Sequence, residues 1–375
     1  MSQVLVTGGL GFIGSHTIGL LLKNGYEVKI IDNLEGQVHN GKIPSNFDGK
    51  VNIVFGDIKD RNTWSKALND VDFIINLAAL TGSSQSFWDL NRYSYSNMIG
   101  TTNLFDILVN EKSLRKNIQK IITASSSYIY GEGSYKCPTH GLTYPEIRKT
   151  NQLRAGKWDY HCKICDELLI PVAVSEDKPP QVPNPYALTK YVSERLTHQY
   201  GEYLEIPALS FRYFNVYGQN QSLSNPYTGV LSVFFTRLAS NKPIVVFEDG
   251  NMSRDFIHVS DIAKYNVMAL DKGEGVFNLG TGVPTKINDL IQKISKNVGL
   301  DPKLEYTGES RVGDIRNVFS DNNNFFKTFG TTTFKKLEWG IKEFVEWASH
   351  QEFNEQFDRA EKERKFYSPD LSKQI

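Results

Sequence analysis

Short apolar runs recur along the first third of the chain, and a longer amphipathic stretch follows each one. The runs cover residues 4–7, 27–31, 51–55, 73–76 and 120–124. They are almost wholly apolar rather than alternating, which is typical of parallel strands that helices cover on both faces. The pattern predicts an α/β fold with a doubly wound parallel sheet.

Two later stretches depart from this pattern. Residues 132–183 hold all three cysteines and many prolines but show no helical or strand period, which predicts an inserted subdomain. After Phe214 the elements are mixed and the loops lengthen, which favours a smaller second domain at the strand ends, with a substrate crevice between the two. The expected domains are 1–213 with the insert 132–183, then 214–350, then a tail over 351–375.

The formal charges balance, with 42 Lys and Arg against 42 Asp and Glu. No overall field therefore attracts nucleic acid or an anionic membrane, and local groups must hold any anionic ligand. Charged residues gather in the tail, where residues 353–366 have a helical pattern. We interpret this segment as a solvated or oligomer-capping helix.

Targeting signals are not evident in the sequence. No apolar run reaches the roughly 18 residues that a membrane-spanning helix needs, and Met1 leads directly into a strand-like run. Three cysteines are too few for a secreted disulfide framework. These features predict a cytoplasmic protein.

A glycine-rich motif follows the first predicted strand and opens a helix. Gly8 would allow the tight turn, Gly11 the approach of a pyrophosphate, and Gly14 close packing of helix on strand. The alternative is a glycine-rich turn without a ligand. In this context the motif predicts a Rossmann dinucleotide site, with Phe12 and Ile13 in the same turn.

Asp32 ends the second predicted strand, where a carboxylate accepts hydrogen bonds from an adenosine ribose. It would repel a 2′-phosphate, and residues 33–35 include no arginine to receive one, so the sequence predicts NAD rather than NADP. Further candidates follow the third and fourth strands, although each could instead be a helix cap. The predicted cofactor-binding residues are Gly8, Gly11, Phe12, Ile13, Gly14, Asp32, Asn33, Asp57, Ile58, Leu77, Ala78, Ala79, Tyr186 and Lys190.

Tyr186 and Lys190 lie one helical turn apart after Pro185 and therefore share a face. A free phenol, with a pKa of about 10, is a poor base at neutral pH, but a nearby ammonium favours the phenolate. Serines 125–127 end the fifth predicted strand, and a hydroxyl there can hydrogen-bond a substrate hydroxyl. The combination predicts acid–base chemistry on an alcohol.

These motifs, together with residues 76–79 and 212–218, resemble the extended short-chain dehydrogenase/reductase family of sugar-nucleotide epimerases and dehydratases over about residues 1–350. The resemblance implies a catalytic set of Ser126, Tyr186 and Lys190. It also implies a nucleotide-sugar substrate and predicts contacts to its diphosphate or sugar. The predicted substrate-binding residues are Thr81, Ser126, Asn215, Arg254 and Arg311, with weaker expectations for residues 82–84 and Asn97. Either arginine could instead form only a surface ion pair.

The same resemblance helps to select the reaction. Dehydratases of this family carry an Asp-Glu pair after the catalytic hydroxyl, where this chain has Ser127 and Tyr128. A 4-epimerase that works through a transient 4-keto sugar and keeps its NAD bound is therefore expected, and the family predicts a homodimer. The alternatives are another sugar-nucleotide oxidoreductase, dehydratase or decarboxylase, a UDP-glucose 4-epimerase, or a dinucleotide-sensing regulator.

The insert contains Cys137-X-X-His140 and Cys162-X-X-Cys165. Two pairs of soft or borderline ligands predict a closed structural zinc site formed by Cys137, His140, Cys162 and Cys165. His161 could replace His140, and a redox-active Cys162/Cys165 pair or metal-free thiols are the other interpretations. A long insert of this kind resembles that of dTDP-L-rhamnose 4-epimerases more than the short link of UDP-glucose 4-epimerases.

Overall fold

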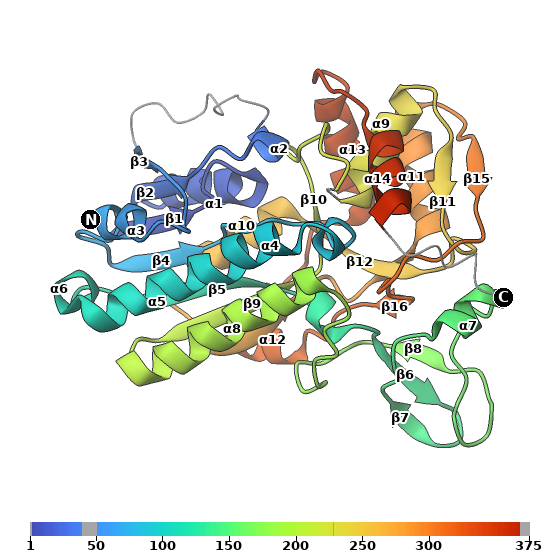
Figure 1. Ribbon diagram of the computed structural model, residues 1–375, viewed down its shortest axis with the longest axis horizontal. Helices are drawn as coiled ribbons and strands as arrows, with labels where there is room; N and C mark the ends of the chain where they lie inside the picture. Colours follow the sequence, from blue (N-terminus) through green and yellow to red (C-terminus); the bar gives the residue numbers. More distant parts are fainter. Residues whose placement is uncertain (1, 40–50, 228, 368–375) are drawn as a thin grey trace.

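A computed structural model describes residues 2–39, 51–227 and 229–367 of the chain (Figure 1). Its main sheet has seven parallel strands in the order β13-β9-β5-β4-β1-β2-β3. All five strands expected from the apolar runs are present, and the doubly wound α/β class is confirmed. The strand bounds are β1 Gln3–Thr7, β2 Glu27–Asp32, β3 Val51–Phe55, β4 Phe73–Asn76, β5 Lys120–Ser126, β9 Ala208–Tyr213 and β13 Gly275–Leu279.

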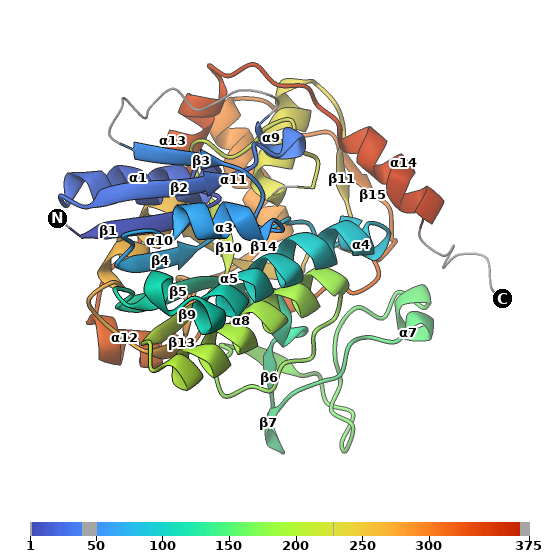
Figure 2. The same ribbon diagram turned by 60° about the vertical axis from the view of Figure 1, so that its left-hand side comes forward.

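Helices cover both faces of this sheet (Figure 2). Alternate side chains of β1 belong to different apolar clusters: Val4 and Val6 pack on one side and Leu5 on the other, which is why the run is apolar throughout. One face carries α3 (Arg61–Ala67), α5 (Gly100–Asn110) and α8 (Pro185–Leu204), and the other α1 (Phe12–Lys23), α10 (Val259–Met268) and α12 (Asn323–Phe329).

A second unit packs beside the carboxyl edge of the sheet. Its strands are β10 (Asn215–Tyr217), β12 (Ser253–His258), β14 (Pro284–Lys286) and β16 (Asn317–Val318), with a separate pair β11 (Ile244–Val246) and β15 (Leu304–Tyr306). Its helices α9 (Val230–Ala239), α11 (Ile287–Val298) and α13 (Leu337–Ala348) share one apolar core. The chain returns once to the main sheet through β13, and the domain boundaries at 213 and 350 remain a prediction.

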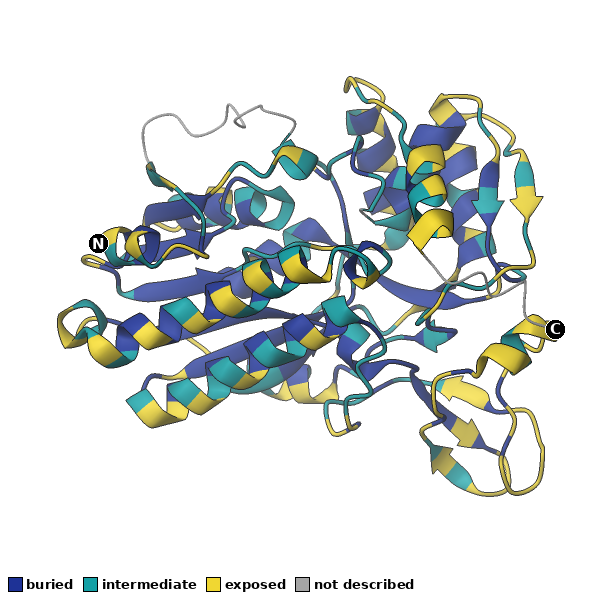
Figure 3. Cartoon of the chain, in the orientation of Figure 1, coloured by how far each residue is buried: buried dark blue, intermediate teal, exposed yellow. Residues whose placement is uncertain are grey.

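The insert projects from the lower right of Figure 1. It contains short strands that the sequence pattern did not indicate, in an antiparallel sheet ordered β7-β6-β8, and a short helix. Many of its residues are exposed (Figure 3). A small buried core of the insert includes Tyr135 and Tyr160. Its elements are β6 (Ser134–Cys137), β7 (Gly141–Thr143), α7 (Thr150–Arg154) and β8 (Ile170–Val172).

The remaining elements are short, apart from one helix near the end of the chain. That helix, α14 (Phe357–Tyr367), lies against the second unit. Among the described residues, no helix combines the length and the apolar character that crossing a membrane requires. The short elements are α2 (Gly36–His39), a 3-10 turn (Gln85–Phe87), α4 (Leu90–Tyr93), a π-helical segment (Ser94–Ile99), α6 (Lys112–Arg115) and a second 3-10 turn (Ser127–Tyr130).

Candidate active site

A cavity of about 490 Å³ opens at the carboxyl edge of the main sheet, where the second unit meets it. Ligands of doubly wound folds bind at this edge. All of the predicted cofactor-binding residues and the main predicted substrate-binding residues lie in its wall. These residues are Gly8, Gly11, Phe12, Ile13, Gly14, Asp32, Asn33, Asp57, Ile58, Leu77, Ala78, Ala79, Thr81, Ser126, Tyr186, Lys190, Asn215, Arg254 and Arg311.

The glycine turn has no room for side chains. Gly8 has a φ of +65°, and a Cβ there would lie 3.0 Å from the backbone of Ala78. A Cβ on Gly14 would lie 2.3 Å from the carbonyl oxygen of Gly8. No side chain caps α1 at Gly11, so the first amide groups of the helix remain available to an anion at the cavity wall.

Asp32 is the last residue of β2 and is buried. Its carboxylate accepts hydrogen bonds from the backbone amides of Leu10, at 3.0 Å, and Leu34, at 2.9 Å, and His39 lies 3.4 Å away. These contacts fix the carboxylate at the wall of the cavity, beyond the glycine turn. The turn and this carboxylate together suit a dinucleotide whose adenosine ribose carries free hydroxyls.

Ser126 and Tyr186 meet inside the cavity. Ser126 ends β5, and its side chain hydrogen-bonds the Tyr186 side chain and accepts from the amide of Tyr128 at 3.2 Å. Ser125 instead donates to the buried Glu194 at 2.6 Å, so its hydroxyl has a structural partner. Of these two serines, only Ser126 is placed to share a proton with Tyr186.

Burial changes the acidity of Tyr186 and Lys190 in opposite directions. It raises the pKa of Tyr186 to about 12, although the Ser126 hydrogen bond opposes the shift. It lowers the pKa of Lys190 to about 8, with Glu194 opposing. Tyr186 alone is therefore a weaker acid than free tyrosine, and a positive charge brought into the cavity would be needed to favour its phenolate.

Local sequence explains why α8 presents these side chains. Asn184 caps the helix by accepting from the amide of Ala187 at 2.9 Å, and Pro185 occupies the first turn. One turn beyond Lys190, Glu194 forms a buried ion pair with Arg212 on β9 at 2.7 Å. The helix is thus fixed to the sheet next to the residues that line the cavity.

The two predicted substrate arginines share one carboxylate. Arg254 lies 3.0 Å and Arg311 2.9 Å from opposite oxygens of Asp314, whose side chain is 6% exposed. Burial alone would raise the pKa of Asp314, but Arg311 and Arg254 hold it at about 2. Asp314 therefore orients both guanidinium groups at the cavity wall, and this residue had no distinguishing signal in the sequence.

Asp314→Asn should lower the free energy of unfolding by about 2–3 kcal/mol at neutral pH, from about 1.4 kcal/mol per pKa unit. The depressed pKa stabilises the folded chain fully above the ordinary value near 3.9 and loses that effect as the pH falls through 2. Urea unfolding of both proteins at several pH values would measure the difference. It should be constant above pH 5 and shrink below pH 4, whereas exposed Asp301→Asn should change little. A pH-independent difference would contradict this account.

Some expectations need correction. Asn97 does not line the cavity: it is buried, accepts from the amide of Leu80 at 2.8 Å and donates to Thr189 at 2.9 Å. Its side-chain amide holds the loop after β4 against α8, so it is not free to bind a sugar hydroxyl.

Thr7 has a structural role that the sequence did not indicate. Its hydroxyl accepts hydrogen bonds from the backbone amides of Leu77 and Ala78.

Several cavity residues carry no motif that a sequence could reveal. Trp88 and Tyr227 come from loops, and α14 contributes a whole helix face. Tyr128 packs edge-on against Tyr186, with ring centroids 6.2 Å apart. The interpretation of the tail as a solvated or oligomer-capping helix is therefore incomplete.

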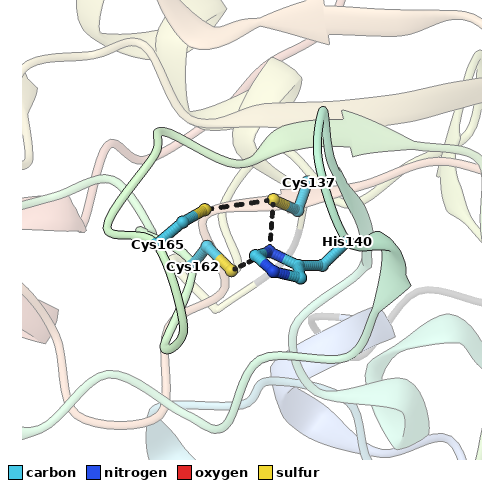
Figure 4. Close-up of side chains that lie close together, drawn as sticks. All are labelled: Cys137, His140, Cys162 and Cys165. Carbon is cyan, nitrogen blue, oxygen red and sulfur yellow. Dashed lines mark hydrogen bonds between the residues drawn. The ribbon is translucent and has the colours of Figure 1, made fainter.

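The cysteines of the insert converge with His140 (Figure 4). Cys137 Sγ lies 3.5 Å from His140 Nδ1 and 3.6 Å from Cys165 Sγ, and Cys162 Sγ lies 3.5 Å from His140 Nδ1. All four ligand atoms lie within 4.8 Å of one another. Ligands of a tetrahedral zinc ion are about 3.5–3.8 Å apart, from bonds of about 2.0–2.3 Å. The three distances above match this spacing, and the three cysteines and one histidine are a ligand set that suits zinc. His161 lies outside the group and is exposed.

The insert is also fixed to the second unit, close to residues that line the cavity. Buried Arg148 forms an ion pair with Glu248 at 2.7 Å and contacts the carbonyl oxygen of Asp314 at 3.4 Å. Buried Glu132 accepts from the amides of Arg316 and Asn317, each at 2.7 Å. The folded insert thus supports the segment that follows Arg311.

The fold and the site together are typical of enzymes that bind a dinucleotide cofactor. The features that indicate this class are the doubly wound sheet, the glycine turn and the Ser-Tyr-Lys group. The chain belongs to the NAD dependent epimerase/dehydratase family, whose model matches residues 4–152 and 168–280. The unmatched stretch between these ranges contains Cys162 and Cys165 of the insert.

Two proteins of named activity are similar to almost the whole chain. A dTDP-L-rhamnose 4-epimerase of Burkholderia thailandensis is 32% identical over 93% of this chain and 95% of its own. A putative UDP-glucose 4-epimerase of Methanocaldococcus jannaschii is 31% identical over 92% of this chain and 98% of its own.

A solved structure is similar to the fold. The UDP-glucuronic acid 4-epimerase of Bacillus cereus, in complex with UDP-glucuronic acid and NAD, has a TM-score of 0.74 and 26% identity, and the match covers 92% of this chain and 99% of that one.

Proposed function

We propose that the protein is an NAD-dependent 4-epimerase of a nucleotide-activated sugar. The observation that carries the proposal is the placement of Ser126, Tyr186 and Lys190 in one cavity with the glycine turn and the paired arginines. Relatives and a structural neighbour named as sugar-nucleotide 4-epimerases cover more than nine tenths of the chain and support it.

In this mechanism Tyr186 takes the proton of the sugar 4-hydroxyl, and Ser126 holds that hydroxyl by a hydrogen bond. Lys190 is charged below its pKa of about 8, and its ammonium would favour the phenolate together with the positive charge of a bound nicotinamide ring. The glycine turn and Asp32 would hold NAD, which would accept the hydride of sugar carbon 4 and later return it to the opposite face of that carbon. The resulting 4-keto sugar turns in the cavity before Tyr186 returns the proton, while Arg254 and Arg311 retain the diphosphate.

For the substrate we propose dTDP-L-rhamnose or a closely similar sugar. The full-length similarity to a dTDP-L-rhamnose 4-epimerase and the long Cys/His insert support this choice. The similarity to a putative UDP-glucose 4-epimerase makes UDP-glucose the specific rival.

The purified protein should invert carbon 4 of dTDP-L-rhamnose without added cofactor. Proton NMR couplings at carbon 4 would report this inversion, with UDP-glucose followed in parallel. If only UDP-glucose were inverted, the assignment as a 4-epimerase would stand and the proposed substrate would change to UDP-glucose. A reaction that requires a stoichiometric supply of NAD or NADH would overturn the epimerase in favour of a net oxidoreductase.

We also propose that Cys137, His140, Cys162 and Cys165 bind a structural zinc ion. The ligand spacing supports it, and a closed set of four ligands leaves no open position for catalysis. The small core of the insert supports it too, since few apolar side chains are buried there.

The predicted homodimer is retained as a proposal. The family uses the two long helices near residues 86–111 and 186–201, and in this chain Tyr95, Ile99 and Leu188 are exposed there. Sedimentation equilibrium that yields the mass of a single chain would exclude it.

A further inference from the structure

Helix α14 turns one face into the cavity. Phe357, Ala360, Glu361 and Arg364 all line it. These positions follow the spacing i, i+3, i+4, i+7, which places them on one side of a helix. Arg359 and Lys362, on other sides of α14, are exposed.

The helix is attached on both sides of the cavity. On the second unit, Asp358 contacts Arg237 at 2.6 Å and Lys242 at 3.0 Å. Toward the main sheet, the ring of Tyr367 stacks on Trp88, with centroids 5.8 Å apart and planes 12° from parallel. The helix thus bridges both parts of the protein.

Arg364 lies beside a predicted substrate residue. Its guanidinium carbon is 5.3 Å from the centroid of the Phe247 ring, and that of Arg311 is 4.6 Å from the same centroid. The two guanidinium groups on one ring repel each other, and nearby carboxylates offset this repulsion. Glu361 lies 2.9 Å and Glu309 3.1 Å from Arg364. A diphosphate that enters beside Arg311 would offer the arginine a stronger bidentate partner than these carboxylates.

We infer that α14 is a wall of the nucleotide-sugar site and that Arg364 is a third arginine for the nucleoside diphosphate, beside Arg254 and Arg311. The inference rests on the proposed substrate class. It assigns a binding role to a helix outside residues 4–280, where the family model ends.

The test is titration calorimetry of NAD-loaded protein with dTDP and with UDP. Arg364→Gln should weaken the better-bound nucleotide at least about tenfold, or about 1.4 kcal/mol, and Arg364→Lys should retain part of the affinity. Arg359→Gln removes the same charge from an exposed position of α14 and is the matched control, so its affinity should stay within about twofold of wild type. Steady-state kinetics should show a higher KM in Arg364→Gln with kcat nearly unchanged.

Unchanged affinity in Arg364→Gln, or equal losses in both glutamine variants, would overturn the inference. The titration measures binding and requires no turnover, so it tests the role of Arg364 separately from the reaction. A protein that binds dTDP through Arg364 but shows no activity would refute only the assignment as a 4-epimerase. A protein that binds neither nucleotide would refute both.

Discussion

Tyr186→Phe should lower turnover by about 10²–10⁴-fold, the usual contribution of a general acid–base group. The substitution removes only the hydroxyl that hydrogen-bonds Ser126, and the ring still packs against Tyr128. NAD content should therefore stay as in the wild type. The measurements are the rate of inversion at carbon 4 and the absorbance of NAD released from the denatured protein.

The control is Tyr203→Phe, which makes the same change at a side chain 71% exposed near the end of α8. Its rate should equal that of the wild type. Full activity of Tyr186→Phe would remove this residue from the mechanism. Loss of activity together with loss of NAD would indicate a structural rather than a chemical role.

His140→Ala should abolish zinc binding and unfold the insert. Zinc binding to small structural sites is worth on the order of 10 kcal/mol, which is more than the few buried side chains of the insert can replace. Elemental analysis would measure the zinc, and proteolysis within residues 138–170 would detect the unfolding. Because the insert supports the segment after Arg311, the KM for the nucleotide sugar should rise as well.

His161→Ala is the matched control, since His161 is exposed and outside the ligand group. It should keep its zinc, its resistance to proteolysis and its KM. Equal zinc content in the wild type and His140→Ala would refute the site. Loss of zinc in His161→Ala alone would assign the fourth ligand to His161.

The local sequence was sufficient for much of the fold and for part of the site. Parallel strands buried on both faces must be apolar throughout, so the five runs of the first third predicted five strands of the main sheet. The glycine turn could be predicted from the sequence because its geometry requires glycine: there is no space for a side chain at Gly8 or Gly14. The sequence also predicted that Tyr186 and Lys190 share one face of a helix, because one helical turn separates them.

The tertiary structure decided what depends on contacts between distant segments. Ser125 and Ser126 have different roles because their hydroxyls contact different partners. The Ser126 hydroxyl contacts Tyr186, and the Ser125 hydroxyl contacts Glu194. His140 rather than His161 reaches the cysteines because the chain folds back between β6 and β7.

The same holds for the substrate side of the cavity. Asp314 gains its role from two arginines that approach it through folding, and one of them, Arg254, lies far from it along the chain. The polar composition of the tail predicts a charged, solvated helix, yet one face of α14 lines the cavity. Periodicity determines which residues share a face, but only the packing of distant elements determines what that face meets.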